Sequence, residues 1–230
     1  QVRQADSLLA DPGDRFDIIM TNPPFGTKST VKIFSEEGKT EKDKISYERD
    51  DFWATSSNKQ LNFVQHVKTI LKVNGKCAIV VPDNVLFEGG DGEIVRKKLL
   101  EQVDLHTMLR LPTGIFYAGG VKANVLFFDK KPAREDGKPW TEKVWIYDLR
   151  TNKHFTQKEK KMTRADLDDF VACYNAKNIQ ERKKTERFKS FSYDDIIKRD
   201  KVSLDIFWLK DESLIDLENL PEPHVIADEI

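Results

Sequence analysis

Four consecutive residues, Asn22, Pro23, Pro24 and Phe25, could hold and activate an aromatic amino group. Asn22 offers a side-chain carbonyl, and Pro23 offers a backbone carbonyl with no N–H of its own beside it. Two rigid acceptors suit an exocyclic NH2 group, because accepting both hydrogens favours a pyramidal nitrogen and frees its lone pair for attack. Phe25 supplies a flat face on which a base can stack. The alternative interpretation is a strand that ends in a proline-rich turn.

An apolar run over residues 16–20 leads directly into this tetrad. Such a short, nearly continuous stretch predicts a parallel strand that is covered on both faces. The prolines end the strand, because they cannot donate ladder hydrogen bonds and they restrict the preceding residue to extended conformations. Asn22 is therefore expected at the carboxyl end of a buried strand, which is where ligands bind in open α/β sheets.

The tetrad resembles the catalytic motif of S-adenosylmethionine-dependent N6-adenine DNA methyltransferases. The wider chain resembles the modification subunit of type I restriction–modification systems, and the resemblance covers essentially all of it. The matching stretches are residues 22–26, 57–63, 80–87, 121–128 and 204–209.

The resemblance implies that the full enzyme transfers a methyl group from S-adenosylmethionine to N6 of an adenine flipped out of duplex DNA. In that reaction Asn22 and Pro23 would hold the amino group, Pro24 would fix the turn and Phe25 would stack on the base. Asp6 stands where the family places an acidic residue near the cofactor's adenine. An acidic residue there is also an ordinary turn or helix-cap residue.

The resemblance also implies the partners, which are DNA, a specificity subunit that reads the bases, a restriction subunit that cuts, and a second modification subunit. The sequence contains no recognition-helix or zinc-finger motif, which fits that division of labour. Two other functions stay open. Similar tetrads occur in methyltransferases that act on RNA or on a protein glutamine, and the chain as given could serve only in assembly.

The family cradles the methionine end of the cofactor in a Gly-rich loop upstream of the tetrad. No such glycine cluster precedes Asp17. We therefore expect the chain to be a fragment in which half of the cofactor site is missing.

The overall composition gives no general attraction to nucleic acid, because the formal net charge of the 230 residues is -1. Local patches or partner subunits must then supply the positive field. The two cysteines, Cys77 and Cys173, have no metal-site spacing and suggest free thiols, which suits the cytoplasm. No apolar run approaches the length of a membrane helix.

The order of expected elements predicts an α/β fold, a partial Rossmann-like methyltransferase sheet. Residues 1–150 are expected to be the C-terminal part of the catalytic domain, and residues 151–230 a charged, mostly helical region. A helix over 58–74, stopped by Gly75, should connect the first strand in parallel to a second strand over 77–81. A further helix is expected over 92–100, and further strands over 103–111, 121–128 and 144–149. The strands 103–111 and 121–128 are joined by too short a link for a crossover, so they should form an antiparallel hairpin at the sheet edge.

Several other residues are candidates for contact with the target base or DNA. Phe116 and Lys122 lie in the hairpin connection, where an aromatic ring could form the second face of a base sandwich or simply cover the sheet edge. Asn58 and Gln60 could face DNA from a helix start, or belong to a solvated helix cap.

Two further segments have predicted roles. Residues 26–57 are polar and long for a loop, which is typical of a lid over the base or of a surface insertion. The C-terminal region has expected helices over 163–175 and 192–198, and an apolar patch at 207–209 that should anchor it to the catalytic domain.

Overall fold

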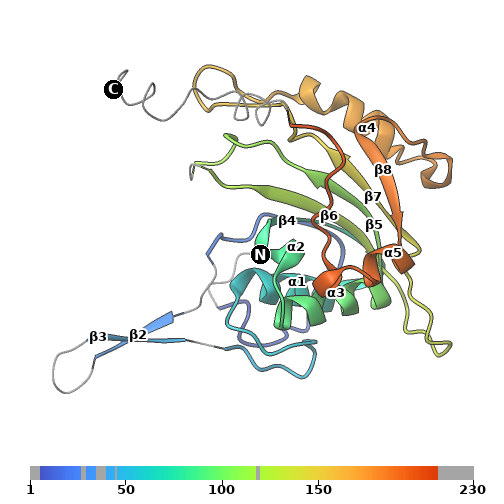
Figure 1. The fold of residues 1–230 in the computed structure, drawn as a ribbon. Helices are drawn as coiled ribbons and strands as arrows, with labels where there is room; N and C mark the ends of the chain where they lie inside the picture. Colours follow the sequence, from blue (N-terminus) through green and yellow to red (C-terminus); the bar gives the residue numbers. More distant parts are fainter. Residues whose placement is uncertain (1–5, 27–29, 35–39, 45, 118–119, 212–230) are drawn as a thin grey trace, which may run out of the picture.

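The computed structural model describes residues 6–26, 30–34, 40–44, 46–117 and 120–211, and its centre is a six-stranded sheet (Figure 1). The strands are β1 (Phe16–Thr21), β4 (Leu71–Pro82), β5 (Val103–Arg110), β6 (Ala123–Lys130), β7 (Lys143–Asp148) and β8 (Phe188–Ser192). Across the sheet they lie in the order β1-β4-β6-β5-β7-β8. β1 and β4 are parallel, as are β5 and β7, whereas β6 and β8 run antiparallel to their neighbours.

The predicted hairpin is confirmed as β5 and β6, but its predicted place at the sheet edge is wrong. β6 lies in the interior, where Val125 faces Val80 of β4 on one side and Leu109 of β5 on the other. β7 and β8 then extend the sheet beyond β5. The short hairpin connection fixes only the antiparallel pairing of β5 with β6. It carries no information on which strand pairs with the other side of β6.

This topology brings the ends of several strands to the same edge of the sheet. Thr21 of β1 pairs with Ile79, close to the end of β4. Pro82 at the end of β4 faces Ala123 at the start of β6. The ends of β5 and β7 also meet, at Arg110 and Asp148. The tetrad, the hairpin connection and the segments after β4 and β7 therefore emerge together.

Helices cover both faces of the sheet. The helices α1 (Lys59–Ile70), α2 (Asn84–Phe87), α3 (Asp91–Gln102) and α5 (Tyr193–Ile197) lie on one face, and α4 (Asp168–Tyr174) lies on the other (Figure 1). Short 3-10 turns are η1 (Arg164–Leu167), η2 (Ile179–Glu181) and η3 (Asp200–Val202). The predicted parallel connection from β1 through α1 to β4 is confirmed.

The helix before β4 is shorter than predicted. It ends at Ile70 rather than near residue 74, because Leu71 already pairs with Phe16 of β1. Gly75 lies within β4 and does not stop the helix. A Cβ at Gly75 would lie 2.8 Å from the Lys72 carbonyl oxygen and 3.0 Å from that of Asp17, so this glycine allows β1 and β4 to approach closely.

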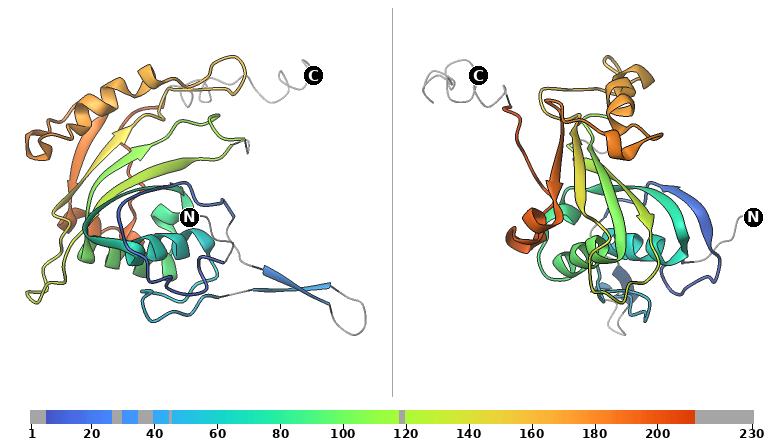
Figure 2. Two further views of the ribbon diagram at one scale, coloured as in Figure 1. Left: turned by 180° about the vertical axis from the view of Figure 1, so that it is seen from behind. Right: turned by 90° about the vertical axis from the view of Figure 1, so that its right-hand side faces the viewer.

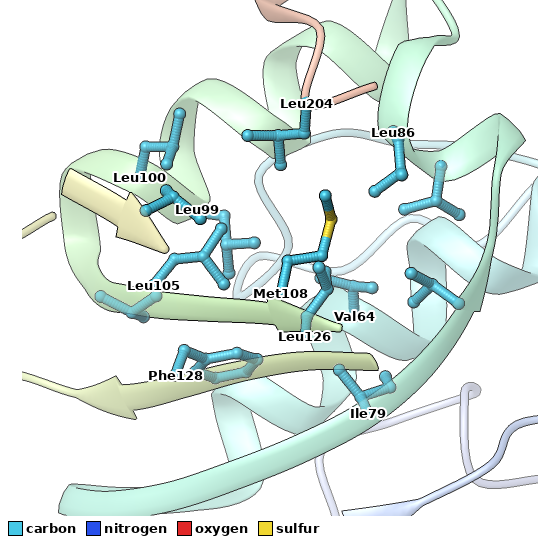
Figure 3. Packing of buried hydrophobic residues seen from close by; sticks show 14 of the residues in the cluster. Val64, Ile79, Leu86, Leu99, Leu100, Leu105, Met108, Leu126, Phe128 and Leu204 are labelled. Atoms are coloured by element: carbon cyan, nitrogen blue, oxygen red, sulfur yellow. The ribbon is translucent and has the colours of Figure 1, made fainter. Parts of the chain in front are cut away.

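The helices and strands bury two apolar clusters. On the face with α1 and α3, Val64 and Leu99 meet Ile79 and Met108 of the sheet (Figure 3). The cluster on the face with α4 includes Phe170. A fully buried side chain of this size contributes about 1.5–3 kcal/mol through removal from water. The two clusters hold the strand ends in place from both sides.

β1 is not the buried strand that its sequence predicts. Phe16 is 46% exposed, Ile18 66% and Met20 81%. Among the described residues, β1 pairs with β4 alone, and one of its faces carries exposed apolar side chains. The apolar run correctly predicted the strand. Within the part of the chain that the structure describes, no element packs on the face of β1 that carries Phe16, Ile18 and Met20.

The segment after the tetrad contains a two-stranded ribbon, where only a loop was expected. It is formed by β2 (Thr30–Phe34) and β3 (Thr40–Lys44), and it projects from the body of the protein (Figure 2). Residues 27–29, 35–39 and 45 lie outside the described part. A lid over the base stays a prediction.

The C-terminal region carries the expected helical stretches, α4 with η1 and α5. It also contributes β8, which was not expected and which continues the sheet past residue 150 by pairing with β7. Within the described residues, no helix combines the length and apolar character that crossing a membrane requires.

Candidate active site

The tetrad follows β1 directly, as predicted. Asn22 is exposed and Pro23 is buried, so the backbone next to the Asn22 side chain is held by packing. Phe25 is half-buried and lies at a cavity of about 580 Å³, here called the tetrad cavity. Its other walls come from the start of α1, the end of β4 and the hairpin connection. The residues lining it are Phe25, Gly26, Gln60, Pro82, Asp83, Asn84, Phe87, Gly120, Val121, Lys122, Asp205 and Phe207.

The aromatic residues Phe25 and Phe116 lie together, but not as two parallel faces. Their ring centroids are 5.2 Å apart and the rings meet edge to face at 83°. Rings in direct edge-to-face contact leave no gap for a base between them. In this arrangement Phe116 supports Phe25 from the side.

Two buried polar atoms of the tetrad cavity have no hydrogen-bond partner among the described residues. They are Oε1 of Gln60, which is 4% exposed as a residue, and Nδ2 of Asn84. A buried polar group without a partner costs about 1–3 kcal/mol. One atom accepts and the other donates, so a ligand with a donor and an acceptor could satisfy both. Sequence reasoning identified Gln60 as a site residue and missed Asn84, although Asn84 lies in the matching stretch 80–87.

Asn58 is a buried helix cap rather than the solvated cap that the sequence allowed, and its contact with DNA stays a prediction. Its side-chain oxygen accepts from the backbone N–H groups of Gln60 at 3.0 Å and Leu61 at 3.4 Å. Its amide donates to Glu88 Oε2 at 2.8 Å, and the residue is 9% exposed. Asn58 therefore fixes the first turn of α1 and with it the position of Gln60.

An ion pair braces the strand ends below the cavity. Arg150 donates to both carboxylate oxygens of Asp83, at 2.7 and 2.9 Å, and to the carbonyls of Leu111 at 2.9 Å and Ala123 at 2.8 Å. Burial raises the pKa of Asp83, but hydrogen bonds and charge from Arg150 outweigh burial and lower that pKa. Sequence reasoning missed this pair because the two residues are 67 positions apart.

A second cavity of about 590 Å³, here called the basic cavity, adjoins the first. The two share Asp83, Lys122 and Phe207 as lining residues. Lys122 is exposed where they meet, and its carbonyl accepts from Asp83 N at 3.1 Å. The structure thus places Lys122 at the tetrad cavity, where a residue that contacts the target base or DNA would have to lie.

Asp6 lies in the turn before β1, and both of its carboxylate oxygens are engaged. Oδ1 accepts from Leu8 N and Oδ2 from the Tyr47 hydroxyl, each at 2.9 Å. One carboxylate bonded in this way does not make a site for a cofactor as large as S-adenosylmethionine. The described residues alone therefore do not fit that cofactor. They also contain no group of three or more His, Cys, Asp or Glu residues suited to a metal ion.

Comparison with known proteins places the chain in a family. The model of the N-6 DNA methylase family matches residues 1–206. The chain is 40% identical to the type I restriction enzyme StySPI methylase subunit of Salmonella potsdam and to the EcoKI methylase subunit of Escherichia coli K12, over 93% and 92% of its length. The crystal structure of the EcoKI M protein matches 98% of the chain with a TM-score of 0.72 and 36% identity. This chain covers 43% of each of the two curated relatives and 49% of the crystallised chain. The chain belongs to the N-6 DNA methylase family.

Proposed function

We propose that the protein containing this chain transfers a methyl group to N6 of adenine in DNA, as the modification subunit of a type I restriction–modification complex. The observation that carries the proposal is the position of the tetrad at the end of β1, beside a cavity with unpaired polar atoms. The family match and the names of its relatives support the same reaction.

The side chains have distinct roles in this proposal. Asn22 and the carbonyl of Pro23 accept the two hydrogens of the adenine amino group, which concentrates the nitrogen lone pair for attack. Pro24 keeps the turn rigid, and Phe25 stacks on the base. Gln60 and Lys122 lie at the tetrad cavity, where they can contact the target base or the DNA next to it.

S-adenosylmethionine is the proposed methyl donor, since the family consists of methylases. Asp6 remains the proposed contact to its adenine. Each Asp6 carboxylate oxygen accepts one hydrogen bond within the protein and keeps a lone pair that can accept another from a ligand.

The proposed partners follow from the type I names of the relatives. They are DNA, a specificity subunit, a restriction subunit and a second modification subunit, in the cytoplasm. A solved structure that describes complex assembly of the type I restriction–modification system matches 99% of this chain at a TM-score of 0.66 and 25% identity. That likeness supports a place in a multi-subunit complex.

One observation favours the non-catalytic alternative for the chain by itself. The chain covers less than half of the length of its curated relatives, so the chain taken alone can serve in subunit assembly without catalysing methyl transfer. Binding of S-adenosylmethionine to the isolated chain at micromolar concentration, measured by calorimetry, would exclude that alternative.

The test of the reaction is a methyl-transfer assay with labelled cofactor and duplex DNA, using the intact protein with its partner subunits. Label recovered as N6-methyladenine is expected. Asn22→Ala should lower turnover by about 100-fold or more, comparable to losing one preorganised hydrogen bond to the reacting group, with little change in cofactor binding. Label on RNA or protein instead of DNA, or normal turnover of the variant, would contradict the proposal.

A further inference from the structure

Phe207 presents an aromatic ring to solvent from a segment that is otherwise firmly packed. The residue is 64% exposed, whereas Ile206 before it is 6% exposed. Trp208 after it donates from Nε1 to the Glu186 carbonyl at 2.7 Å and packs against Phe191. The sequence predicted the whole apolar patch as an anchor. Phe207 departs from that prediction, because its neighbours anchor the segment and its own ring does not.

A buried arginine holds one side of the Phe207 ring. The guanidinium carbon of Arg110 lies 4.0 Å from the ring centroid, and the Arg110 side chain is fully buried. Arg110 is itself fixed by hydrogen bonds to Asp205 Oδ1 at 2.9 Å and the Ile206 carbonyl at 3.0 Å. A ring positioned by a fixed cation beneath it is a rigid platform whose exposed surface can accept another flat group.

The platform stands where the tetrad cavity and the basic cavity meet. Phe207 lines both, together with Lys122 and Asp83. A ligand with one flat group beside Phe25 therefore passes Phe207 as it continues into the basic cavity. Chains of linked aromatic groups, such as nucleotides, have this form.

The charge of the basic cavity suits a phosphate backbone. Lys122, His154 and Lys210 are exposed on its lining. Two carboxylates also line it: Asp83 is neutralised by its bidentate pair with Arg150, and Asp211 offsets one of the two exposed lysines. This local excess of basic groups contrasts with the formal net charge of -1 for the chain.

We propose that Phe207 stacks on the base next to the extruded adenine, while the basic cavity receives the adjoining phosphates through Lys122 and Lys210. The proposal rests on the proposed function for the identity of the strand as DNA. Its content is a second aromatic contact, separate from Phe25, that holds the strand after the target base has left the stack.

The test measures DNA binding rather than turnover. Phe207→Leu and Phe207→Trp are made in the intact protein with its partner subunits, and dissociation constants are measured by fluorescence anisotropy on a duplex with the recognition site. A second duplex carries abasic sites in place of the bases that flank the adenine. Trp140→Leu is the matched control, because Trp140 also lies over an arginine, Arg134 at 4.4 Å, but lines neither cavity.

Phe207→Leu should weaken binding to the normal duplex about tenfold, as the loss of one stacked base does. It should have no further effect on the abasic duplex, and Phe207→Trp should bind like the wild type. An equal loss on both duplexes, or less than twofold on the normal one, would overturn the proposal. If Phe207→Leu weakened the binding of a partner subunit and left DNA binding unchanged, the proposal would also be overturned, and the ring would belong to a protein–protein contact.

The two proposals fail in different ways. A tenfold Phe207 effect without any N6-methyladenine product would refute the reaction and retain the strand site. Normal methylation without a Phe207 effect would refute the strand site alone.

Discussion

The brace between Arg150 and Asp83 makes a quantitative prediction. Arg150→Ala removes a bidentate ion pair and the hydrogen bonds to Leu111 and Ala123, which together join the ends of β4, β5, β6 and β7. The two side chains are 12% and 18% exposed, so Asp83 would be left largely buried without its ion-pair partner, with the Asn124 amide still donating to it at 2.8 Å. Breaking a buried ion pair by removing one partner costs about 3–5 kcal/mol. Partial exposure places the expected loss near the lower end, at about 3 kcal/mol.

The assay is thermal and urea unfolding of the intact protein. A loss of about 3 kcal/mol should lower Tm by roughly 6–12 °C in a domain of this size. The double variant Asp83→Ala/Arg150→Ala should lose clearly less than the sum of the single variants, because the stranded charge is removed as well. Arg150→Lys should restore little, since an ammonium group cannot make the two-pronged contact.

A matched control exists on the surface. Arg134 makes the same two-pronged contact with Asp136, at 2.9 and 2.6 Å, but the side chains are 28% and 46% exposed. Arg134→Ala should leave Tm nearly unchanged, because exposed pairs are screened by water. A loss below about 1 kcal/mol for Arg150→Ala, or additive single losses, would refute the idea that this brace holds the strand ends.

Two further predictions concern the hairpin connection and the opposite end of the sheet. Gly114→Ala should reduce both Tm and methyl transfer. Gly114 has φ +83°, and a Cβ added there would lie 1.8 Å from the Phe155 carbonyl oxygen, so the backbone beside Phe116 would have to move. Unchanged values of both Tm and methyl transfer would contradict this prediction. Burial raises the pKa of Asp129, but His106 and Lys76 outweigh burial and lower it to about 2. Because the folded pKa is the lower one, its contribution of roughly 2 kcal/mol is complete above about pH 4 and is lost as the pH falls toward 2. Asp129→Asn should abolish that part of the pH dependence of urea unfolding, and an unaltered profile would exclude the assignment.

The elements that the sequence predicted correctly depend on local chemistry. The end of β1 was predictable because Pro23 and Pro24 stop a strand wherever they occur, and the hairpin because its connection is short. The end of α1 was not, since Gly75 is an ordinary helix stop and only the pairing of Leu71 with β1 overrides it. Propensity yields to such long-range pairing.

The same distinction between local and long-range features separates the site residues that the sequence predicted from those that it missed. The tetrad was identified because its chemistry lies in adjacent residues. The brace from Arg150, the unpaired Asn84 and the outward ring of Phe207 depend on segments that meet only in the folded chain. An apolar triplet at 207–209 cannot show which ring turns outward, because that choice depends on the arginine beneath it.

The antiparallel direction of β6 has a consequence for how such a protein can diversify. Because β6 starts where β5 ends, the connection over residues 111–122 leaves and re-enters the sheet at the edge that carries the tetrad. Loop length costs little free energy, so insertions there leave the strand pairing intact as long as Gly114 keeps its left-handed conformation. The loop can therefore acquire new side chains next to the tetrad without any change to the strands that hold the tetrad in place.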